Sequence, residues 1–418
     1  MSANGVSPAG ASVAQRFTPY QRRLLVFLGV ANFFEGYDHY AFAMVLPNLR
    51  ADMGLGETGG GLLSAFINLG TVIAYLFVRR ADRWGRRRVL TVTILGYTLF
   101  TVLSGLAPDV YSFALFQMVG RIFLIGEWAT SMVVAAEEFP AERRGTAMGI
   151  LVAMSSLGSV VCGGVAPLLL NTAYGWRSVY FVGIVPLLLI AYARRGLRET
   201  QRFSESTADQ RSHSLWDIWR TPYRRRVLQL GLIWFLSYLC TNNAVVFWKE
   251  FALAERGMTD AQVGKVITIA AVVAMPLVFL AGSLLDRVGR RRGASVIFAL
   301  TSIGVFGGYT LHGTWPLTAC VALAIFGVSA VLPVLNAFTT ELFPTEYRGI
   351  AYAWSNNLLG RIGYVLSPAA LGALASEWGW GHAIRSTAIF PLIALFLILL
   401  WMPETKAREL EQTAALER

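Results

Sequence analysis

Charged side chains are scarce in this sequence. Asp, Glu, Lys and Arg make up only 15% of its 418 residues, whereas 55% of the residues are hydrophobic. Soluble domains contain roughly 25% charged residues. So little charge cannot cover the surface of a water-soluble protein of this length, and a soluble fold is therefore excluded.

Motifs for catalysis, nucleotide binding and metal binding are absent as well. The sequence has no Gly-rich loop ending in Gly-Lys-Ser or Gly-Lys-Thr, which excludes direct use of ATP, and no His-Glu-x-x-His or Gly-x-Ser-x-Gly motif. Its three cysteines, Cys162, Cys240 and Cys320, lie singly in apolar segments, and its four histidines are scattered. We therefore expect no enzymatic activity, no metal and no cofactor.

Long apolar runs are present instead, and they recur from one end of the chain to the other. A membrane-spanning helix needs about 20 mainly apolar residues, and lipid forces such a segment to be helical. About twelve segments meet this requirement. They are residues 24–46, 61–79, 89–107, 111–136, 146–170, 178–193, 227–251, 261–285, 293–311, 316–340, 350–374 and 384–402. The sequence thus predicts an all-α protein embedded in a lipid bilayer, without a cleavable signal peptide.

The longest polar interruption divides these segments into two sets of six. The predicted parts are a tail at 1–23, a six-helix half at 24–193, a central loop at 194–226, a second six-helix half at 227–402 and a tail at 403–418. Residues 215–219 fit a short amphipathic helix at the membrane interface. Lys and Arg concentrate in the tails and in the loops on their side, which predicts a cell-membrane protein with both termini in the cytoplasm. This asymmetry also explains the net charge of +11 without a nucleic-acid partner.

Two motifs occur once in each half. The sequence Asp-Arg-Trp-Gly-Arg-Arg-Arg at 82–88 recurs as Asp-Arg-Val-Gly-Arg-Arg-Arg at 286–292, and the Glu-rich stretch at 137–145 recurs at 341–349. Both motifs recur after 204 residues, which chance rarely produces. The shared offset spans six helices, so the halves have the same orientation in the membrane. Parallel repeats of this kind place a substrate site between the halves near the bilayer midplane.

The repeated loops are predicted to form an inter-domain latch on the cytoplasmic side. Their Asp residues can pair with an Arg or face a helix N-terminus, their Gly residues permit a turn with positive φ, and broken pairs would let the halves rock. The alternative is that the Arg clusters only fix the topology. The predicted latch residues are Asp82, Arg83, Gly85, Arg86, Glu137, Arg144, Asp286, Arg287, Gly289, Arg290, Glu341 and Arg348.

The doubled Asp-Arg-x-Gly-Arg-Arg loop resembles the inter-helix signature of the major facilitator superfamily. The resemblance covers the chain from about Gln21 to Glu404. It implies a secondary transporter of two six-helix halves that open alternately to the two sides of the membrane. We expect such a transporter to act as a monomer.

Glu35 and Asp38 are ionisable residues in the middle of the first apolar segment. A charge at mid-bilayer costs about 2.5–3.5 kcal/mol on insertion scales, which makes both residues functional candidates. They are three residues apart and share a helix face, and Gly36 between them permits close approach of another helix or a ligand. The pair suits reversible proton binding during transport. The alternative is a static buried network that joins helices.

Arg121, near the middle of the fourth segment, is the predicted partner of Asp38. A deprotonated Asp38 would pair with Arg121, and protonation would release the arginine to bind an anionic substrate. The sequence from Glu35 to Asp38 resembles the Asp-Gly-x-Asp motif of aromatic-acid:proton symporters, and this resemblance implies coupling roles for Asp38, Glu35 and Arg121. Glu127 lies nearer the cytoplasm and fits either a structural partner of the first latch or a substrate ligand.

Arg361 is a second deep cation, in the middle of the eleventh segment, and it suits a carboxylate through bidentate hydrogen bonds. The alternative is that it anchors a neighbouring helix. Nearby amides and one aromatic side chain are further candidates, although each could equally serve helix packing. The predicted substrate-binding residues are Arg121, Arg361, Tyr37, Asn242, Asn243, Asn356 and Asn357.

These features predict proton-coupled uptake of a small organic anion, such as an aromatic or other carboxylate. One alternative is a proton-driven exporter of drugs or metabolites. The other is a membrane sensor that does not transport. A sensor would need a signalling domain, and the C-terminal tail of 16 residues is too short for one.

Overall fold

The computed structural model describes residues 17–185 and 214–406, without the side chains of residues 76–83, 141, 142 and 345. Helices are the only regular structure over this part of the chain. They are α1 (Pro19–Met53), α2 (Glu57–Trp84), α3 (Arg86–Gly105), α4 (Val110–Glu138), α5 (Ala141–Leu170), α6 (Arg177–Phe181), the 3-10 helix η1 (Asp217–Arg220), α9 (Arg224–Val246), α10 (Trp248–Ala254), α11 (Asp260–Val288), α12 (Arg290–Gly308), α13 (Thr314–Glu341), α14 (Thr345–Tyr352), the π-helix η2 (Ala353–Gly360), α15 (Arg361–Ser386) and α16 (Ile389–Trp401).

The helices coincide with the apolar segments predicted from the sequence, although the sixth segment is described only to residue 185. Over the described residues, seven helical stretches are long and apolar enough to cross a membrane, or eight when α9 and α10, bent by 47°, count as one span. One of these stretches, Glu346–Trp401, contains both the eleventh and the twelfth predicted segments. The all-α membrane fold of two six-helix halves is confirmed. Near the predicted interfacial helix at 215–219 the structure has the short 3-10 helix η1, and its place at a membrane interface stays a prediction.

Local sequence signals set the helix ends. Thr18, Asp109 and Thr259 cap α1, α4 and α11, and in each capping box the side-chain oxygen accepts a hydrogen bond from a backbone N–H of the first turn. Gly85 and Gly289 separate α2 from α3 and α11 from α12 with φ of 89° and 99°. Both repeated loops therefore use the glycine turn that the sequence predicts.

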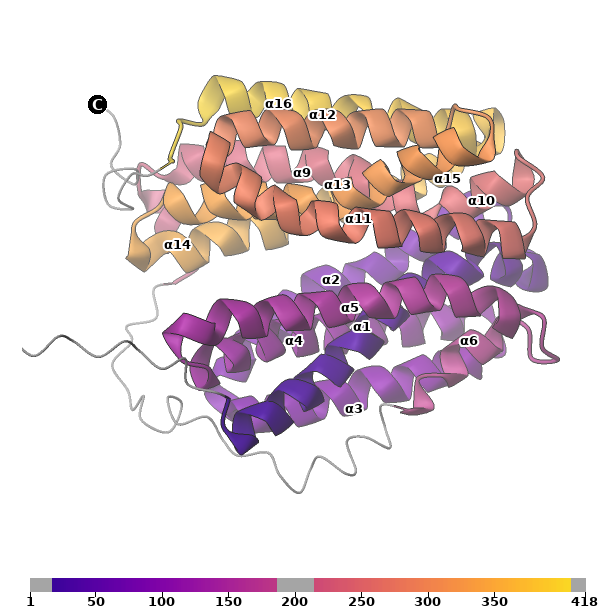
Figure 1. The fold of residues 1–418 in the computed structure, drawn as a ribbon, viewed down its shortest axis with the longest axis horizontal. Helices are drawn as coiled ribbons and strands as arrows, with labels where there is room; N and C mark the ends of the chain where they lie inside the picture. The colour runs from indigo at the N-terminus through magenta and orange to yellow at the C-terminus, as the bar shows by residue number, and fades with distance from the viewer. Residues whose placement is uncertain (1–16, 186–213, 407–418) are drawn as a thin grey trace, which may run out of the picture.

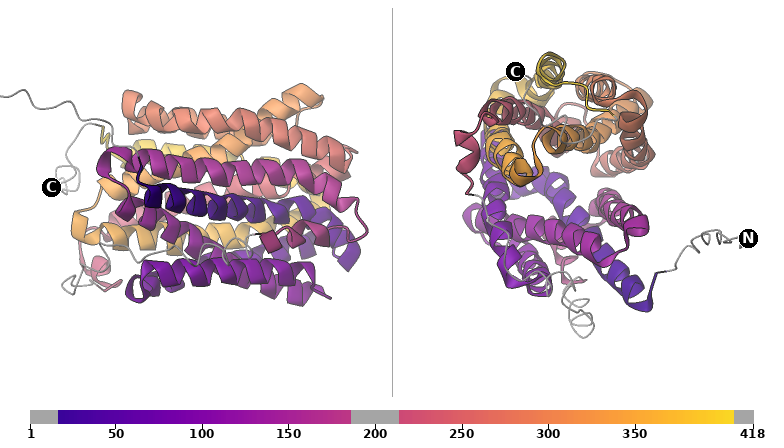
Figure 2. Two further views of the ribbon diagram at one scale, coloured as in Figure 1. Left: turned by 60° about the horizontal axis from the view of Figure 1, so that its bottom comes forward. Right: turned by 90° about the vertical axis from the view of Figure 1, so that its left-hand side faces the viewer.

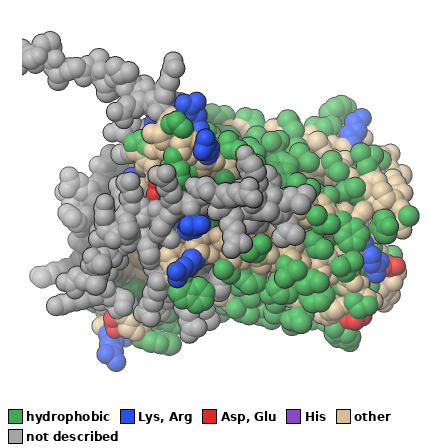
Figure 3. Space-filling model, turned by 90° about the horizontal axis from the view of Figure 1, so that it is seen from below, with side chains coloured by type: hydrophobic (Ala, Val, Ile, Leu, Met, Phe, Trp, Pro, Cys, Tyr) green, Lys and Arg blue, Asp and Glu red, His purple; other side chains and the backbone are tan. Residues whose placement is uncertain are grey.

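The helices form two bundles, α1–α6 and α9–α16, which lie side by side (Figures 1 and 2). The start of α1, the end of α16 and the loops at Gly85 and Gly289 lie at one end of the bundles, here called the termini end; the turns at Gly54, Gly257 and Gly313 lie at the opposite, far end. Figure 3 shows a broad hydrophobic surface between ends that carry charges. Exposed side chains such as Val92, Leu95 and Leu99 on α3 suit contact with lipid tails.

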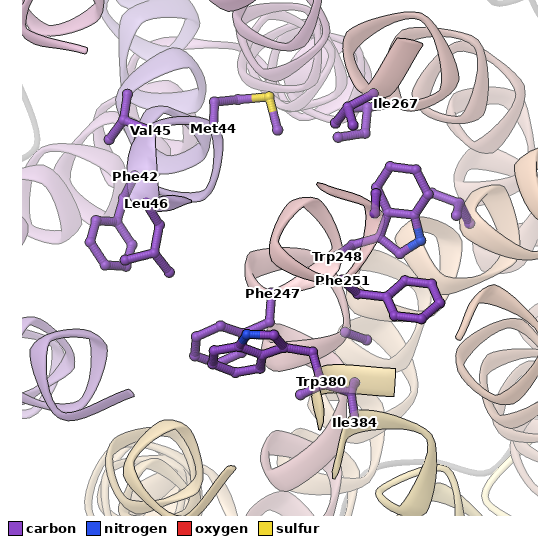
Figure 4. Packing of buried hydrophobic residues seen from close by; sticks show 14 of the residues in the cluster. Phe42, Met44, Val45, Leu46, Phe247, Trp248, Phe251, Ile267, Trp380 and Ile384 are labelled. Atoms are coloured by element: carbon purple, nitrogen blue, oxygen red, sulfur yellow. The ribbon is translucent and has the colours of Figure 1, made fainter. Parts of the chain in front are cut away.

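One hydrophobic cluster crosses from the first half to the second at the far end. It joins Met44 and Leu46 of α1 to Phe247 next to α10 and to Trp380 of α15 (Figure 4). The rings of Phe247 and Trp380 stack at a centroid distance of 4.5 Å. The other described clusters each belong to a single half. Continuous packing between the halves is therefore found at the far end.

Glycines let the halves approach closely in the same region. A Cβ atom on Gly61 of α2 would lie 2.4 Å from the carbonyl oxygen of Pro368 and 2.8 Å from the Cα of Gly372, both on α15. On the other side of the interface, a Cβ on Gly264 of α11 would lie 2.5 Å from Cγ of Pro167 on α5. Any larger residue at these two positions would push the halves apart.

A buried ion network also joins the halves at the far end. Arg50 of α1 donates from Nη1 to Oε2 of Glu250 on α10 at 2.6 Å, and its Nη2 lies 3.0 Å from Oε1 of Glu57. Lys249 donates to the carbonyl oxygen of Met44 at 2.6 Å, and it also pairs with Asp260 at 2.5 Å. The bend between α9 and α10 carries Lys249 and Glu250 into this interface, where both are buried.

Substitution of Gly61 tests the far-end contact. We expect Gly61→Ala to destabilise the protein by about 1–3 kcal/mol, because the added methyl group meets backbone atoms. Gly149→Ala is the matched control, since nothing lies within 4 Å of a Cβ there; it should stabilise α5 by roughly 0.5–1 kcal/mol. Thermal unfolding in detergent measures both effects. Equal shifts for the two variants would contradict the close contact.

Neutralisation of Glu250 tests the ion network. We expect Glu250→Gln to cost about 3–5 kcal/mol, because it leaves the buried charge of Arg50 without its closest partner. Glu57→Gln is the control on the same arginine, because the Glu57 side chain is 42% exposed against 5% for Glu250; its cost should stay below about 1 kcal/mol. Spin-label distances across the far end should broaden only in Glu250→Gln. Unchanged distances in that variant would count against a closing role.

Candidate functional site

Glu35 and Asp38 of α1 are both buried and are held by hydroxyl groups. Ser155 of α5 donates to Oε2 of Glu35 at 2.7 Å, and Thr101 of α3 donates to Oδ2 of Asp38 at 2.8 Å. The second carboxyl oxygen of Asp38 is buried without a hydrogen-bond partner. A buried carboxyl group that is bonded to hydroxyls rather than to a cation can exchange between protonated and ionised forms.

Gly36 serves helix packing in this structure. A Cβ atom at this position would lie 1.8 Å from the carbonyl oxygen of Ser155, and Ser159 donates to the carbonyl oxygen of Gly36 at 2.9 Å. The partner that approaches Gly36 is therefore α5. This contact fixes the rotation of α1, and with it the positions of both carboxyl groups.

The ion pair expected between Asp38 and Arg121 is not formed in the described structure. Arg121 of α4 instead places Nη1 2.9 Å from Nδ1 of His39. The reason is helical geometry: His39 follows Asp38 in sequence and points about 100° further round α1, toward α4, whereas Asp38 points toward α3. A guanidinium group can only donate, so Nδ1 accepts and the neutral His39 ring carries its proton on Nε2.

Arg361 lies at the start of α15, directly after the π-helix η2. Its Nη1 donates across the interface to the carbonyl oxygen of Thr71 on α2 at 3.2 Å, and its Nε is buried without a partner. Both Arg361 and Arg121 are close enough to His39 to act electrostatically on its ring. The exposed imidazole of His39 thus contacts Arg121 of the first half and lies within electrostatic range of Arg361 of the second.

Tyrosines hold two of the predicted amides in the second half. Tyr238 donates to Oδ1 of Asn356 at 2.9 Å, and Tyr364 donates to Oδ1 of Asn242 at 3.0 Å. The two tyrosine rings meet edge to face at 5.4 Å. Arg361 acts electrostatically on Tyr238, so this aromatic and amide group adjoins the cation.

Three other predicted substrate residues have different surroundings. Tyr37 is buried in the first half and donates to the carbonyl oxygen of Val179 at 3.3 Å. Asn243 donates to Ser367 and to the carbonyl oxygen of Leu239, which fixes its amide group within the second half. Asn357 is half-buried on η2. A π-helix widens the turn locally and is common at functional sites.

The repeated loops make the same ion pair in each half. Arg86 lies 3.3 Å from Glu137, and Arg290 lies 2.9 Å from Glu341. Arg290 also contacts Asp286 at 3.1 Å. These described pairs connect helices within one half, so a latch between the halves remains a prediction.

The other predicted latch residues make local contacts or lie outside the described part. The guanidinium group of Arg348 approaches the carbonyl oxygen of Phe343 at 3.5 Å, and the Nε atoms of Arg144 and Arg348 are buried without a hydrogen-bond partner. Arg287 accepts a hydrogen bond from Lys406 through its carbonyl oxygen. The side chains of Asp82 and Arg83 lie outside the described residues.

Glu404, just after α16, extends the second loop network. It accepts hydrogen bonds from the backbone N–H groups of Arg290 at 2.7 Å and Arg291 at 3.0 Å, at the N-terminus of α12. Partial burial acts to raise the pKa of Glu404, but the backbone donors outweigh it, so the pKa lies below its usual value. This contact attaches the described start of the C-terminal tail to the loop.

Sequence reasoning missed several of these residues. His39 and Tyr364 each had a usable signal, because His39 adjoins Asp38 and Tyr364 lies one helical turn beyond Arg361. Lys249 and Glu250 had none, because they follow a bend that apolar periodicity does not reveal. Glu404 lies beyond the last apolar segment, where the sequence offers no expected partner.

Known transporters resemble this chain over almost its whole length. The sialic acid transporter NanX of Escherichia coli is 24% identical over 393 residues, covering 92% of this chain and 95% of NanX. The cis,cis-muconate transport protein of Acinetobacter baylyi is 26% identical over 391 residues, covering 87% of this chain and 91% of that protein. Among solved structures, the inward open conformation of the xylose transporter XylE from E. coli has a TM-score of 0.75 at 20% identity, covering 94% of this chain and 98% of XylE.

The match to a protein family extends through both halves. The model described as Major Facilitator Superfamily matches residues 28–249 and 230–417. The matched stretches contain both copies of the repeated loop and every residue of the candidate site. The chain therefore belongs to the major facilitator superfamily of membrane transporters and is not an enzyme.

Proposed function

We propose that this transporter takes up a small organic anion together with protons, as a monomer in the cell membrane. The observation that carries the proposal is that two buried-region cations from opposite halves act on one site: Arg121 contacts His39, and Arg361 acts on His39 electrostatically. Cations from both halves of a membrane protein are costly unless they meet an anion or a polar partner. A carboxylate bound between them would neutralise both and connect the halves.

The chemistry around Arg361 supports a carboxylate substrate. The guanidinium group of Arg361 can bind a carboxylate with two parallel hydrogen bonds, and its Nε is unpartnered. Because Tyr364 donates to the oxygen of Asn242, the NH₂ group of Asn242 is the donor left for a ligand. The tyrosine rings would suit an unsaturated or aromatic substrate. The relatives named for sialic acid and cis,cis-muconate transport both act on carboxylates.

Proton coupling would reside in Asp38 and Glu35. A protonated Asp38 accepts a hydrogen bond from Thr101, while Arg121 stays with His39 and can bind substrate. Loss of the proton leaves a buried carboxylate that attracts Arg121 away from the substrate. Binding of the anion and of the proton would thus favour each other, as symport requires.

The structure suits a state open to the cytoplasm, with both termini on that side. Lys and Arg are concentrated at the termini end, which supports a cytoplasmic position for that end. The far end, with its hydrophobic cluster and ion network, would then be the closed outer side. A latch between the loops at Arg86 and Arg290 would form in the opposite, outward-open state.

Substitution of Arg361 tests the substrate site. We expect Arg361→Gln to weaken binding by about 30-fold or more, since loss of a charged hydrogen-bonding partner costs about 2–5 kcal/mol. Arg361→Lys should retain part of the affinity. Arg385→Gln at the end of the same helix is the control. Thermal shift with cis,cis-muconate, sialic acid and benzoate measures binding, and xylose is the neutral control. Equal stabilisation of wild type and Arg361→Gln would contradict the site.

Substitution of Asp38 tests the coupling. We expect Asp38→Asn to abolish accumulation driven by a pH gradient in proteoliposomes, while exchange of labelled for unlabelled substrate continues. Asp52→Asn is the control on the same helix, because Asp52 bonds to Trp176 and Arg177 outside the site. Gradient-driven accumulation in Asp38→Asn would exclude the coupling role. Protons that cross the membrane in the same direction as the added substrate support coupled uptake. Protons that cross in the opposite direction identify an exporter.

A further inference from the structure

A third carboxyl group, that of Glu127 on α4, is buried in the first half apart from the predicted latch. Its side chain is 0% exposed. Ser131, one turn later, donates to Oε1 at 2.5 Å, and Oε2 is buried without a hydrogen-bond partner. No cation pairs with it among the described residues. An ionised carboxylate in such surroundings is disfavoured, so Glu127 has a strong tendency to take up a proton when one can reach it.

Unpartnered polar atoms gather around Glu127 and Asp38. Native proteins pair nearly all their buried polar groups, yet the neighbouring helices α1, α3 and α4 carry five exceptions. They are Asn32 Oδ1, Asp38 Oδ1, Tyr97 OH, Thr98 Oγ1 and Glu127 Oε2. Groups without a fixed partner are free to take a new one when a proton arrives or leaves.

Hydroxyl groups on α3 lie between the two carboxyl groups. Thr101 donates to Asp38, and Tyr97 is one helical turn nearer the termini end. The buried hydroxyl of Tyr97 is close enough to both Glu127 and Asp38 for electrostatic interaction. The hydroxyls of Thr101, Thr98 and Tyr97 therefore form a polar strip that leads from Asp38 toward Glu127.

Glu127 lies nearer the termini end than the first proton site. It follows Arg121 by six residues, which is about 9 Å along α4 in the direction of the termini end. The titratable groups described near its carboxyl group are Glu35 of α1 and Tyr97 of α3. Both α2 and α5 also contact α4, and no charged side chain of either is described at Glu127.

We propose that Glu127 is a second proton-binding residue, which receives the proton of Asp38 through the hydroxyl groups of α3. The inference rests on the proton-coupled uptake proposed above and adds a residue and a direction to it. The proton leaves the carboxyl group of Asp38, each hydroxyl accepts one proton and passes one on, and the carboxylate of Glu127 becomes neutral. Asp38 is then ionised and attracts Arg121, which favours release of the substrate anion toward the termini end.

Glu127→Gln keeps the shape and the hydrogen-bonding capacity of the side chain but cannot exchange a proton. We expect it to retain exchange of labelled cis,cis-muconate and to lose accumulation driven by a pH gradient by about tenfold or more, within the range of typical coupling energies. Glu127→Asp should recover part of the accumulation. Asp109→Asn, a cap at the start of the same helix, is the matched control.

Infrared titration supplies a readout that needs no substrate. The C=O stretch of a protonated carboxyl group should decrease as pH rises, and Glu127→Gln should remove one component of it. Wild-type accumulation in Glu127→Gln, loss of exchange as well as accumulation, or an unchanged C=O band would each overturn the proposal. Absence of carboxylate transport or of pH dependence in the wild type would instead defeat the proposed function, and the infrared band would still report on Glu127.

Discussion

The buried ion pair between Arg50 and Glu250 is the interaction on which the relation of the two halves depends. Within each half, helices are joined by their own bonds, such as Arg86 with Glu137. At the far end, Arg50 pairs with Glu250 across the interface at 2.6 Å. Separation of a buried pair is costly unless both charges reach water. In the proposed cycle, opening of the far end would provide that water, which would favour a fully closed or a fully open interface over intermediate ones.

The internal repeat supplies the scaffold, and departures from it supply the chemistry. The loop pairs Arg86–Glu137 and Arg290–Glu341 occupy equivalent places in the two halves. The charged residues of the site and of the interface do not repeat. The equivalent positions, 204 residues away, hold uncharged residues: Asn242 for Asp38, Ile325 for Arg121, Leu157 for Arg361, Val331 for Glu127 and Leu46 for Glu250. Each unrepeated charge had to acquire its own partner, from an adjacent helix or from the other half.

The sequence was sufficient to predict the fold, because apolar length and a doubled motif are local properties of the chain. It also placed Asp38 inside the first apolar segment and Arg361 inside the eleventh, where the structure has Arg361 at the junction of η2 and α15. The partner of Arg121 could not be predicted, since helical spacing gives the face of a side chain and not the helix that the face meets. The bend that buries Lys249 and the π-helix that carries Asn356 arise from packing, which hydropathy does not record.

The contact of Arg121 with neutral His39 resolves a conflict that the predicted ion pair would create. If Arg121 paired permanently with Asp38, the pair would be satisfied, and neither residue would respond to a proton or an anion. A neutral imidazole satisfies one N–H of the guanidinium group without cancelling its charge. Arg121 thus keeps its attraction for both a substrate carboxylate and an ionised Asp38. Because only one of them can take the arginine fully, the protonation state of Asp38 decides whether the substrate is held, and this competition is the physical basis of coupling in the proposed cycle.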